Sequence, residues 1–252
     1  MAFEYHKICA ECGQPFVTTS NVRKYCYNKH YRTCVICDWT YHQDVIKSML
    51  CNLLGVNKYR YYARKLSVVE LTSKQANDFL VENHRQGPCS ASIRLGLVDL
   101  SGQLLSVMTF GKCRSTIGSN GCQWELIRFA SKRDCSVVGG ASKLFAHFIN
   151  QYHPESIVSF SDRAHTRGNL YPQLGFEKVN VSDPNYCWVD TKTDRAYHRL
   201  NAQKRNIKSF LHDDNIDLSK TEKEIMESHG YACVFDSGTI RWEWHSIERS
   251  NT

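Results

Sequence analysis

The sequence predicts an α+β protein with a small cysteine-rich N-terminal module, a mixed-sheet α/β domain and a C-terminal extension of helix and hairpin. Three observations lead to this prediction. Cysteines recur with regular spacing in the first 55 residues, strand and helix patterns alternate through the middle of the chain, and a helix signal followed by two short strands closes it. The boundaries are 1–55 for the module, 56–67 for a linker, 68–192 for the α/β domain and 193–252 for the extension.

The length and composition of the chain limit its number of domains and the cell compartment in which it is expected. At 252 residues it is long enough for one ordinary domain and a small one. There is no run of eighteen apolar residues, so no membrane contact is expected, and the N-terminus lacks the apolar core of a signal peptide. We therefore expect a reducing cytoplasm, in which the 12 cysteines are metal ligands or buried thiols instead of disulfides.

The N-terminal module carries four metal-type ligands in two close pairs: Cys9, Cys12, Cys26 and His30. Such pairs bring soft and borderline ligands to one tetrahedral ion, the arrangement that zinc prefers. The few aromatic residues around them are too few for a module that folds without metal. The sequence therefore predicts a structural zinc, with buried thiols as the alternative.

The cysteine spacing of this site repeats once, shifted by 25 residues along the chain. The repeated positions are Cys34, Cys37 and Cys51. His30 has no counterpart because Gly55 stands at its shifted position, which makes His42 the candidate fourth ligand. The sequence thus predicts one zinc ion or two, depending on whether the second set has kept its metal.

Positive charge is concentrated at the start of the chain. The formal net charge is +7, and residues 1–66 hold ten Lys and Arg against four Asp and Glu. A polyanionic partner, most simply DNA, explains this distribution; a protein-binding module and a basic surface kept for solubility are the alternatives. The linker is either a short helix lying on DNA or a solvated connection. The candidate phosphate contacts are Arg23, Lys24, Lys29, Arg32, Arg60, Arg64 and Lys65.

The α/β domain begins with a predicted helix from Leu71 to His84, with Thr72 or Ser73 as its N-cap. Its apolar face consists of Ala76, Phe79 and Leu80. His84 lies at the end of this helix. It either complements the helix dipole there or serves as a general base or metal ligand.

Strands are predicted next. Ser92–Leu100 and Leu104–Gly111 alternate well enough for a hairpin. The strand Trp124–Phe129 follows and carries Glu125 and Arg128, which face opposite sides of a flat strand because they are three positions apart. Charged side chains on a central strand need partners if they are buried.

A glycine turn at Gly139 and Gly140 then opens a helix. The apolar face of that helix is Leu144, Phe145, Phe148 and Ile149. Backbone N–H groups at such a helix start can hold an anion such as a pyrophosphate, although a plain tight turn is the commoner explanation. The element order is therefore strand, glycine turn, helix, strand, helix, strand, with the second helix ending at Leu174 and Gly175.

Asp162 lies just beyond the expected strand Ile157–Phe160. Ligands gather where the strands of an open α/β sheet end. Asp162 is also the candidate ion-pair partner of Arg128. Tyr171 follows within a few turns, so we expect it to reach the same crevice as Asp162, along with His165 and Arg167.

The α/β domain is predicted to end with a last strand, Asn185–Val189, and the extension to hold two helices and a final hairpin. A basic helix spans Arg195–Lys208, and a second helix spans Lys220–Ser228. The hairpin pairs Ala232–Phe235 with Thr239–Trp244 through a turn at residues 237–238.

Residues Asn169–Phe176 (NLYPQLGF) resemble the C-terminal motif of the GNAT acyltransferase fold, and Ser136–Ala141 (SVVGGA) resembles its acyl-CoA loop. In that loop Ser136 stands where Gln or Arg is usual. The resemblance implies a GNAT-like domain, an acyl donor such as acetyl-CoA, and Tyr171 as general acid. The implied donor-binding residues are Val138, Gly139, Gly140, Ala141 and Ser142.

A narrower resemblance covers roughly residues 68–190. The segments that carry it are Asn83–His84, Trp124–Arg128, Gly140–Ser142 and Ser159–Asp162, followed by Gly168 and Tyr171. They look like the Mom family, phage proteins on a GNAT-like scaffold that convert adenine in DNA to a carbamoylmethyl derivative. The resemblance implies a host-cytoplasmic transferase acting on DNA bases. The implied catalytic residues are His84, Arg128, Asp162 and Tyr171, and Trp124 is expected to line the same pocket.

The chain also resembles phage proteins, often described as homing-endonuclease-like, that join a cysteine-rich module to this domain. The alternative function is therefore a non-catalytic DNA-binding or endonuclease-associated protein that uses the fold as a scaffold. No HNH, GIY-YIG or LAGLIDADG pattern is present, which argues against nuclease activity. Whether the chain is an enzyme is left open by the sequence.

Overall fold

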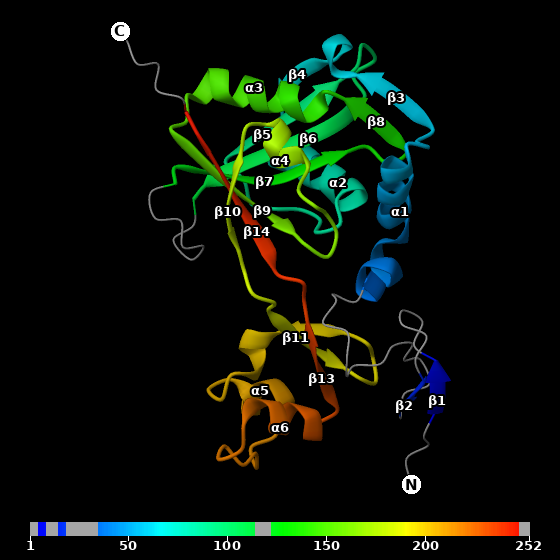
Figure 1. Ribbon diagram of the computed structural model, residues 1–252, viewed down its shortest axis with the longest axis vertical. Helices are drawn as coiled ribbons and strands as arrows, with labels where there is room; N and C mark the ends of the chain where they lie inside the picture. Colours follow the sequence, from blue (N-terminus) through cyan, green and yellow to red (C-terminus); the bar gives the residue numbers. More distant parts are fainter. Residues whose placement is uncertain (1–4, 9–14, 19–34, 114–121, 247–252) are drawn as a thin grey trace. The chain divides into compact units, whose positions relative to one another are not determined.

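The computed structural model describes residues 5–8, 15–18, 35–113 and 122–246 (Figure 1). Contacts divide the chain into two compact units. The larger unit consists of residues 38–182 and 239–252, and the smaller consists of residues 1–37 and 183–238. No helix in the described part of the chain is long and apolar enough to cross a membrane.

The larger unit is built on a seven-stranded mixed sheet with the order β10-β14-β9-β7-β6-β5-β4. Its strands are β4 (Ser67–Glu70), β5 (Ile93–Val98), β6 (Leu104–Lys112), β7 (Trp124–Ser131), β9 (Ser156–Asp162), β10 (Glu177–Val181) and β14 (Thr239–His245). Neighbouring strands are antiparallel except for β7 and β9, which run parallel. The predicted hairpin of β5 and β6 is confirmed.

Helices cover both faces of this sheet. Helix α2 (Ser73–Asn83) has Thr72 as its N-cap in a capping box with Gln75, and its buried face is the predicted one. Helix α3 (Gly140–Tyr152) starts after Gly139, whose positive φ of 75° suits glycine. Neighbouring residues on β6 show that the helices lie on opposite faces, because Val107 packs with α2 and Met108 packs in the core that includes α3.

The segment from β7 to β10 follows the predicted order of elements. A short strand, β8 (Cys135–Val138), precedes α3, and α4 (Leu170–Gln173) lies between β9 and β10. The aromatic core forms on the α3 face, where Phe148 stacks on Phe110 with ring centroids 3.6 Å apart. This part of the larger unit therefore has the succession of strands and helices that the sequence predicts.

The predicted linker belongs to the larger unit. Residues Tyr59–Tyr62 form strand β3, which pairs in parallel with β8, and a 3-10 turn, η1 (Ala63–Lys65), leads into β4. Lys143 ties this segment to α3, because its amine donates hydrogen bonds to the carbonyls of Ala63 and Leu66. The expectation of a short helix or a solvated connection is wrong, because Tyr59–Tyr62 form a strand that is held by its pairing with β8.

The predicted C-terminal hairpin is also wrong. Strand β13 (Tyr231–Phe235) pairs with β11 in the smaller unit, whereas β14 inserts between β10 and β9 of the large sheet. Trp242 on β14 explains the placement, because it stacks on Tyr171 and donates a 2.8 Å hydrogen bond to Ser161. Burial of this indole joins a distant segment to the core.

The smaller unit contains a three-stranded sheet in the order β12-β11-β13, with β11 (Tyr186–Asp190) and β12 (Ala196–His198). Its helical elements are η3 (Arg199–Ala202), α5 (Ile207–Leu211) and α6 (Glu222–Ser228). The expected last strand of the α/β domain is therefore the central strand here, and the expected basic helix is β12, η3 and part of α5. The buried core is Trp188, Ala202, Ile207, Ile216, Ile225 and Met226. Strands β1 (Tyr5–Ile8) and β2 (Pro15–Thr18) form a separate antiparallel pair.

Candidate functional site

The parallel strands β7 and β9 separate along their length. Their paired positions are Trp124 with Ile157 and Glu125 with Val158, at the start of both strands. One residue further on, the Ser159 hydroxyl donates a 2.8 Å hydrogen bond to the Leu126 carbonyl. The carboxyl ends of the two strands then bound an open space, which is where ligands bind in sheets of this kind.

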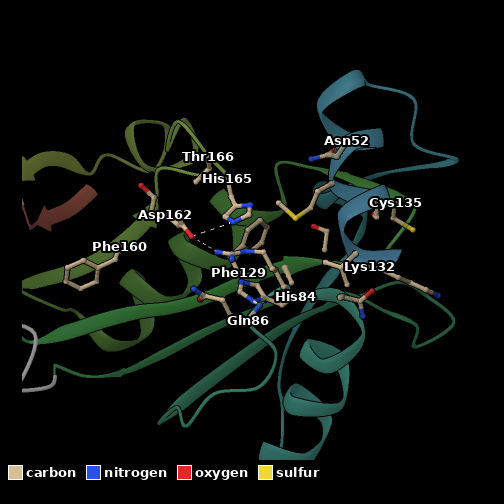
Figure 2. Close-up of a pocket in the computed structure, with 18 of the residues that line it drawn as sticks. Asn52, His84, Gln86, Phe129, Lys132, Cys135, Phe160, Asp162, His165 and Thr166 are labelled. Carbon is tan, nitrogen blue, oxygen red and sulfur yellow. Dashed lines mark hydrogen bonds and ion pairs between the residues drawn. The ribbon is translucent and has the colours of Figure 1, made fainter. Parts of the chain in front are cut away.

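A cavity of about 340 Å³ occupies this space. Its walls come from the ends of β7 and β9, the end of α2, and α1 (Val35–Leu54), which contributes Val45, Ser48 and Asn52. Phe129 and Phe160 line it from the two separated strands, and the Phe129 ring lies beside His165 and His84 (Figure 2). The volume lies in the range of small-ligand pockets, which are mostly apolar with a few placed polar groups.

The polar side of the cavity is centred on the carboxylate of Asp162, the last residue of β9. Arg85 donates to its Oδ2 at 2.9 Å, and the Arg85 and Asp162 side chains are 15% and 23% exposed. The Nε2 atom of His165 lies 3.7 Å from the same oxygen (Figure 2). Oδ1 accepts a 2.9 Å hydrogen bond from the backbone N–H of Ala164. These contacts hold the side chain of Asp162 in a fixed position.

His84 lies across the cavity from α1, where it caps α2 through its backbone N–H. Burial, followed by the charges of Arg128 and Arg85, lowers the pKa of His84 from 6.5 to about 4. Its Nδ1 atom accepts a 3.1 Å hydrogen bond from the Gln86 N–H. The imidazole is thus neutral at physiological pH and carries its hydrogen on Nε2, which makes it a hydrogen-bond donor.

Tyr171 lines the cavity from α4, but its hydroxyl is engaged. The hydroxyl donates to the Phe160 carbonyl at 3.1 Å, and Ser159 lies 3.1 Å away as a donor. Burial raises the pKa of the Tyr171 phenol, against the opposing effects of Ser159 and Arg128. The ring is stacked on Trp242, with centroids 5.1 Å apart and planes at 12°. These contacts hold the ring and hydroxyl in place.

The structure brings together three of the four predicted catalytic residues. His84, Asp162 and Tyr171 all line the cavity. Arg128 acts on His84 through its charge and donates to the Ile127 carbonyl at 2.8 Å. The ion pair at Asp162 is made by Arg85, whereas the sequence suggests Arg128.

Trp124 does not line this cavity, contrary to expectation. It lies at the paired end of β7, buried edge-on against Phe148, and the Lys112 amine lies 4.0 Å from its ring centroid. Its place in the aromatic core results from the direction of β7, because the cavity opens at the other end of the strand.

The predicted donor loop lies at the start of α3. Gly139 and Ser142 are exposed and Gly140 is buried, and the first turn of α3 offers the N–H groups of Gly140, Ala141 and Ser142. The backbone N–H of Lys143 donates a hydrogen bond to the Gly139 carbonyl, which closes the first turn of the helix. These groups fit an anion such as the pyrophosphate of CoA. Neither the loop nor Val138 lines the cavity described above.

The predicted metal ligands are only partly described. Cys9, Cys12, Cys26, His30 and Cys34 lie outside the described residues, as do Arg23, Lys24, Lys29 and Arg32. Cys37 lies in the first turns of α1, and His42 marks a kink in this helix. Cys51 is nine helical positions beyond His42, about 13 Å along the axis. The separation of His42 and Cys51 is larger than one zinc ion spans, and the second ligand set, with Cys34 outside the described residues, stays a prediction.

No group of three or more His, Cys, Asp or Glu side chains in the described part of the chain could hold a metal ion. The first zinc site remains a prediction. Sequence reasoning missed Arg85 and the cavity residues of α1. Arg85 comes directly after His84 in the segment NHRQG, and this adjacency to a predicted site residue could have identified it.

No family model and no curated protein matches this chain. It is similar to a Corynebacterium glutamicum structure described as a histone acetyltransferase and related acetyltransferase, with 17% identity and a TM-score of 0.37 over 48% of this chain and 90% of that one. It is also similar to an Acinetobacter baylyi protein provisionally assigned as an acetyltransferase, with 13% identity and a TM-score of 0.40 over 72% and 93%. Likenesses at these TM-scores assign no activity, so function is inferred from the sheet and the cavity.

Proposed function

We propose that this chain is a GNAT-like transferase that modifies a base of DNA, with adenine as the first candidate and an acyl thioester as the donor. The observation that carries the proposal is the cavity between the separated ends of β7 and β9, where a fixed carboxylate and a neutral imidazole face one space. An amino group has a hydrogen to give to the carboxylate, and a developing oxyanion needs a donor such as the imidazole.

In this proposal Asp162 accepts the hydrogen bond of the base's amino group and then its proton, because Arg85 and Ala164 hold the carboxylate in position. His84 donates from Nε2 to the oxygen on which negative charge develops. The Phe129 ring provides a flat apolar wall for a heterocycle. A CoA thioester would supply the acyl group, its C–S bond breaking as the N–C bond forms and its thiolate leaving with a proton from water.

DNA as the substrate is inferred from charge and from the size of the cavity. A base stacked in a duplex cannot enter such a cavity, so the chain would act on a flipped or unpaired base. The exposed basic side chains of Arg60, Arg64 and Lys65 lie on the same unit as the cavity and suit phosphate contacts. The zinc module, with its own basic residues, would add a second contact to DNA.

A second function is favoured by one observation. The Tyr171 hydroxyl, the expected general acid, is held by the Phe160 carbonyl and by Ser159. A phenol engaged in this way suits a structural role. The alternative is therefore a non-catalytic DNA-binding or endonuclease-associated protein that keeps the sheet as a scaffold.

Both proposed functions can be tested by mass spectrometry of nucleosides from the DNA of cells that express the chain. We expect a new adenine derivative, its loss with Asp162→Ala, and its retention with Asp78→Ala, which removes an exposed carboxylate of α2. Equal amounts of folded protein must be present in each case. Unmodified DNA in all three cultures would overturn the transferase and leave the scaffold function.

A further inference from the structure

Strand β3 presents an exposed basic and aromatic surface on the larger unit. Tyr59 and Tyr62 are 49% and 41% exposed, although large aromatic side chains are usually buried. Arg60 and Arg64 are exposed beside them, and residues 56–69 contain no Asp or Glu. Tyr61, by contrast, faces inward and packs on the core. Arg60 and Tyr62 therefore share one face of the strand, whereas Tyr59 lies on the same face as Tyr61 but is exposed at the start of the strand.

The face that carries Arg60 is organised around the ring of Tyr62. The Arg60 guanidinium carbon lies 5.8 Å from the ring centroid, and that of Arg64 lies 5.4 Å from it. At the start of the strand, the Lys58 amine lies 5.2 Å from the Tyr59 centroid. These cation–π contacts restrict the tyrosines and hold positive charge next to each ring. Little further ordering would be needed before a ligand stacks there.

This surface begins at the rim of the cavity. Tyr59 pairs in register with Cys135, whose side chain lines the cavity, and the Tyr59 N–H donates to the Asp134 carbonyl at 2.9 Å. Helix α1, which precedes β3, lines the same cavity with Ser48 and Asn52. A chain that leaves the cavity beside Cys135 would therefore meet Tyr59 first and Tyr62 next.

We propose that β3 is a platform for an unpaired nucleic-acid strand that crosses this edge strand, with one base stacked on Tyr59, the next on Tyr62 on the opposite face, and phosphates contacting Arg60, Arg64 and Lys65. Exposed aromatic rings interleaved with cations are the combination that binds single strands without reading sequence. The four residues of β3 span about 13 Å, room for about two nucleotides. The identity of the strand as the DNA next to the modified base rests on the proposed function, whereas the platform itself does not.

A duplex fits this surface poorly. Its bases are already stacked on each other, so it would engage the arginines through phosphates and leave both tyrosine rings without a base. The platform therefore predicts a preference for single strands that depends on the rings, and a salt dependence that depends on the cations. These two contributions can be separated by substitution.

The test is fluorescence anisotropy of the full chain with a labelled fifteen-nucleotide oligothymidine over a series of salt concentrations, without donor. Tyr62→Leu should weaken binding about tenfold at unchanged salt slope, because it removes stacking and no charge. Tyr62→Phe should bind like the wild type. Arg64→Gln should lower the salt slope by about 0.7. Arg195→Gln, which removes an arginine stacked on Tyr197 in the smaller unit, is the matched control and should leave binding unchanged.

Photocrosslinking locates the strand independently of other DNA contacts. With bromouracil in the oligonucleotide, we expect crosslinked peptides that contain Tyr59 or Tyr62. Crosslinks confined to other segments, or full affinity in Tyr62→Leu, would overturn the platform whatever the modification assay shows. Ring-dependent binding in cells with unmodified DNA would retain the platform and reject the transferase.

Discussion

The two units of this protein bury different kinds of side chain. In the smaller unit, the fully buried residues described are apolar, with Trp188, Ile207 and Met226 at the centre. The larger unit has its own apolar core, yet it also buries polar side chains. These are Ser106, Thr109, Glu125, Ser156, Ser159 and Ser161, and the last four lie on β7 and β9.

The difference shows what the separation of β7 and β9 requires. Where two strands stop pairing, backbone groups lose their ladder partners and need others. Ser159 meets this need, because it donates to the Leu126 carbonyl one residue beyond the last paired positions. Ser156 accepts from the Gln123 N–H at the paired end of the strands, and Ser161 accepts from the Trp242 indole on β14. A sheet selected only for stability would have no reason to open there. Buried serines therefore supply hydrogen bonds in the part of the sheet that opens to form the cavity.

The largest expected effect tests whether the two apolar cores are equivalent. Leu144 and Ile207 are both fully buried, one in each unit. Leu144→Ala and Ile207→Ala should each lower the free energy of unfolding by about 2–5 kcal/mol, since each leaves a cavity of similar size. Urea denaturation followed by circular dichroism measures this. A loss below about 1 kcal/mol in either variant would show that its core is not packed as described.

The next effect concerns pH and is specific to the larger unit. The pKa of His84 is about 4 in the folded chain against 6.5 as its ordinary value. The unfolded chain then binds this proton more readily, so its stability contribution is complete above about pH 6.5 and is lost as the pH falls towards 4. At about 1.4 kcal/mol per pKa unit, the loss approaches about 3 kcal/mol.

Urea denaturation at pH 7 and pH 5 should therefore show a smaller loss of stability in His84→Gln than in the wild type. The comparison of the two proteins removes the contributions of all other titrating groups. The direct check is NMR titration of the His84 ring. An ordinary histidine titration there would contradict the buried environment of the cavity wall.

The smallest of the three effects concerns the buried serines. Ser161→Ala leaves the buried indole N–H of Trp242 without its acceptor and should cost about 1–3 kcal/mol. The control is Ser182→Ala, whose hydroxyl makes exposed contacts with Thr239 and should change stability by less than about 0.5 kcal/mol. If both substitutions lowered the free energy of unfolding equally, the buried Ser161 would be no more important to stability than the exposed Ser182.

Local sequence patterns predict most of the larger unit. The capping box of α2, the hairpin of β5 and β6 and the glycine start of α3 depend on residues close in sequence, and all are confirmed. His84 and Asp162 are expected in one pocket through the resemblance to the Mom family, and both line the cavity. Signals of this kind need no knowledge of distant contacts.

The remainder depends on contacts between distant segments. Nothing near β14 in the sequence indicates that it pairs with β10 and β9 instead of its neighbour β13. The pairing of β3 with β8 is likewise set by residues more than seventy positions away. Arg85 could not be chosen over Arg128 as the partner of Asp162, because the direction of each side chain depends on how α2 meets β9.

The position of β14 also makes residues 183–238 an insertion within the chain of the larger unit. Val181 and Ile240 are register partners, and the Ser182 N–H donates to the Thr239 carbonyl at 2.9 Å. The chain thus leaves and re-enters the large sheet at adjacent points, as it would in a simple β-hairpin. Chains are most readily extended, exchanged or recombined where their ends meet in this way. Residues 183–238 could accordingly be exchanged between relatives as a cassette while the sheet and its cavity are inherited intact.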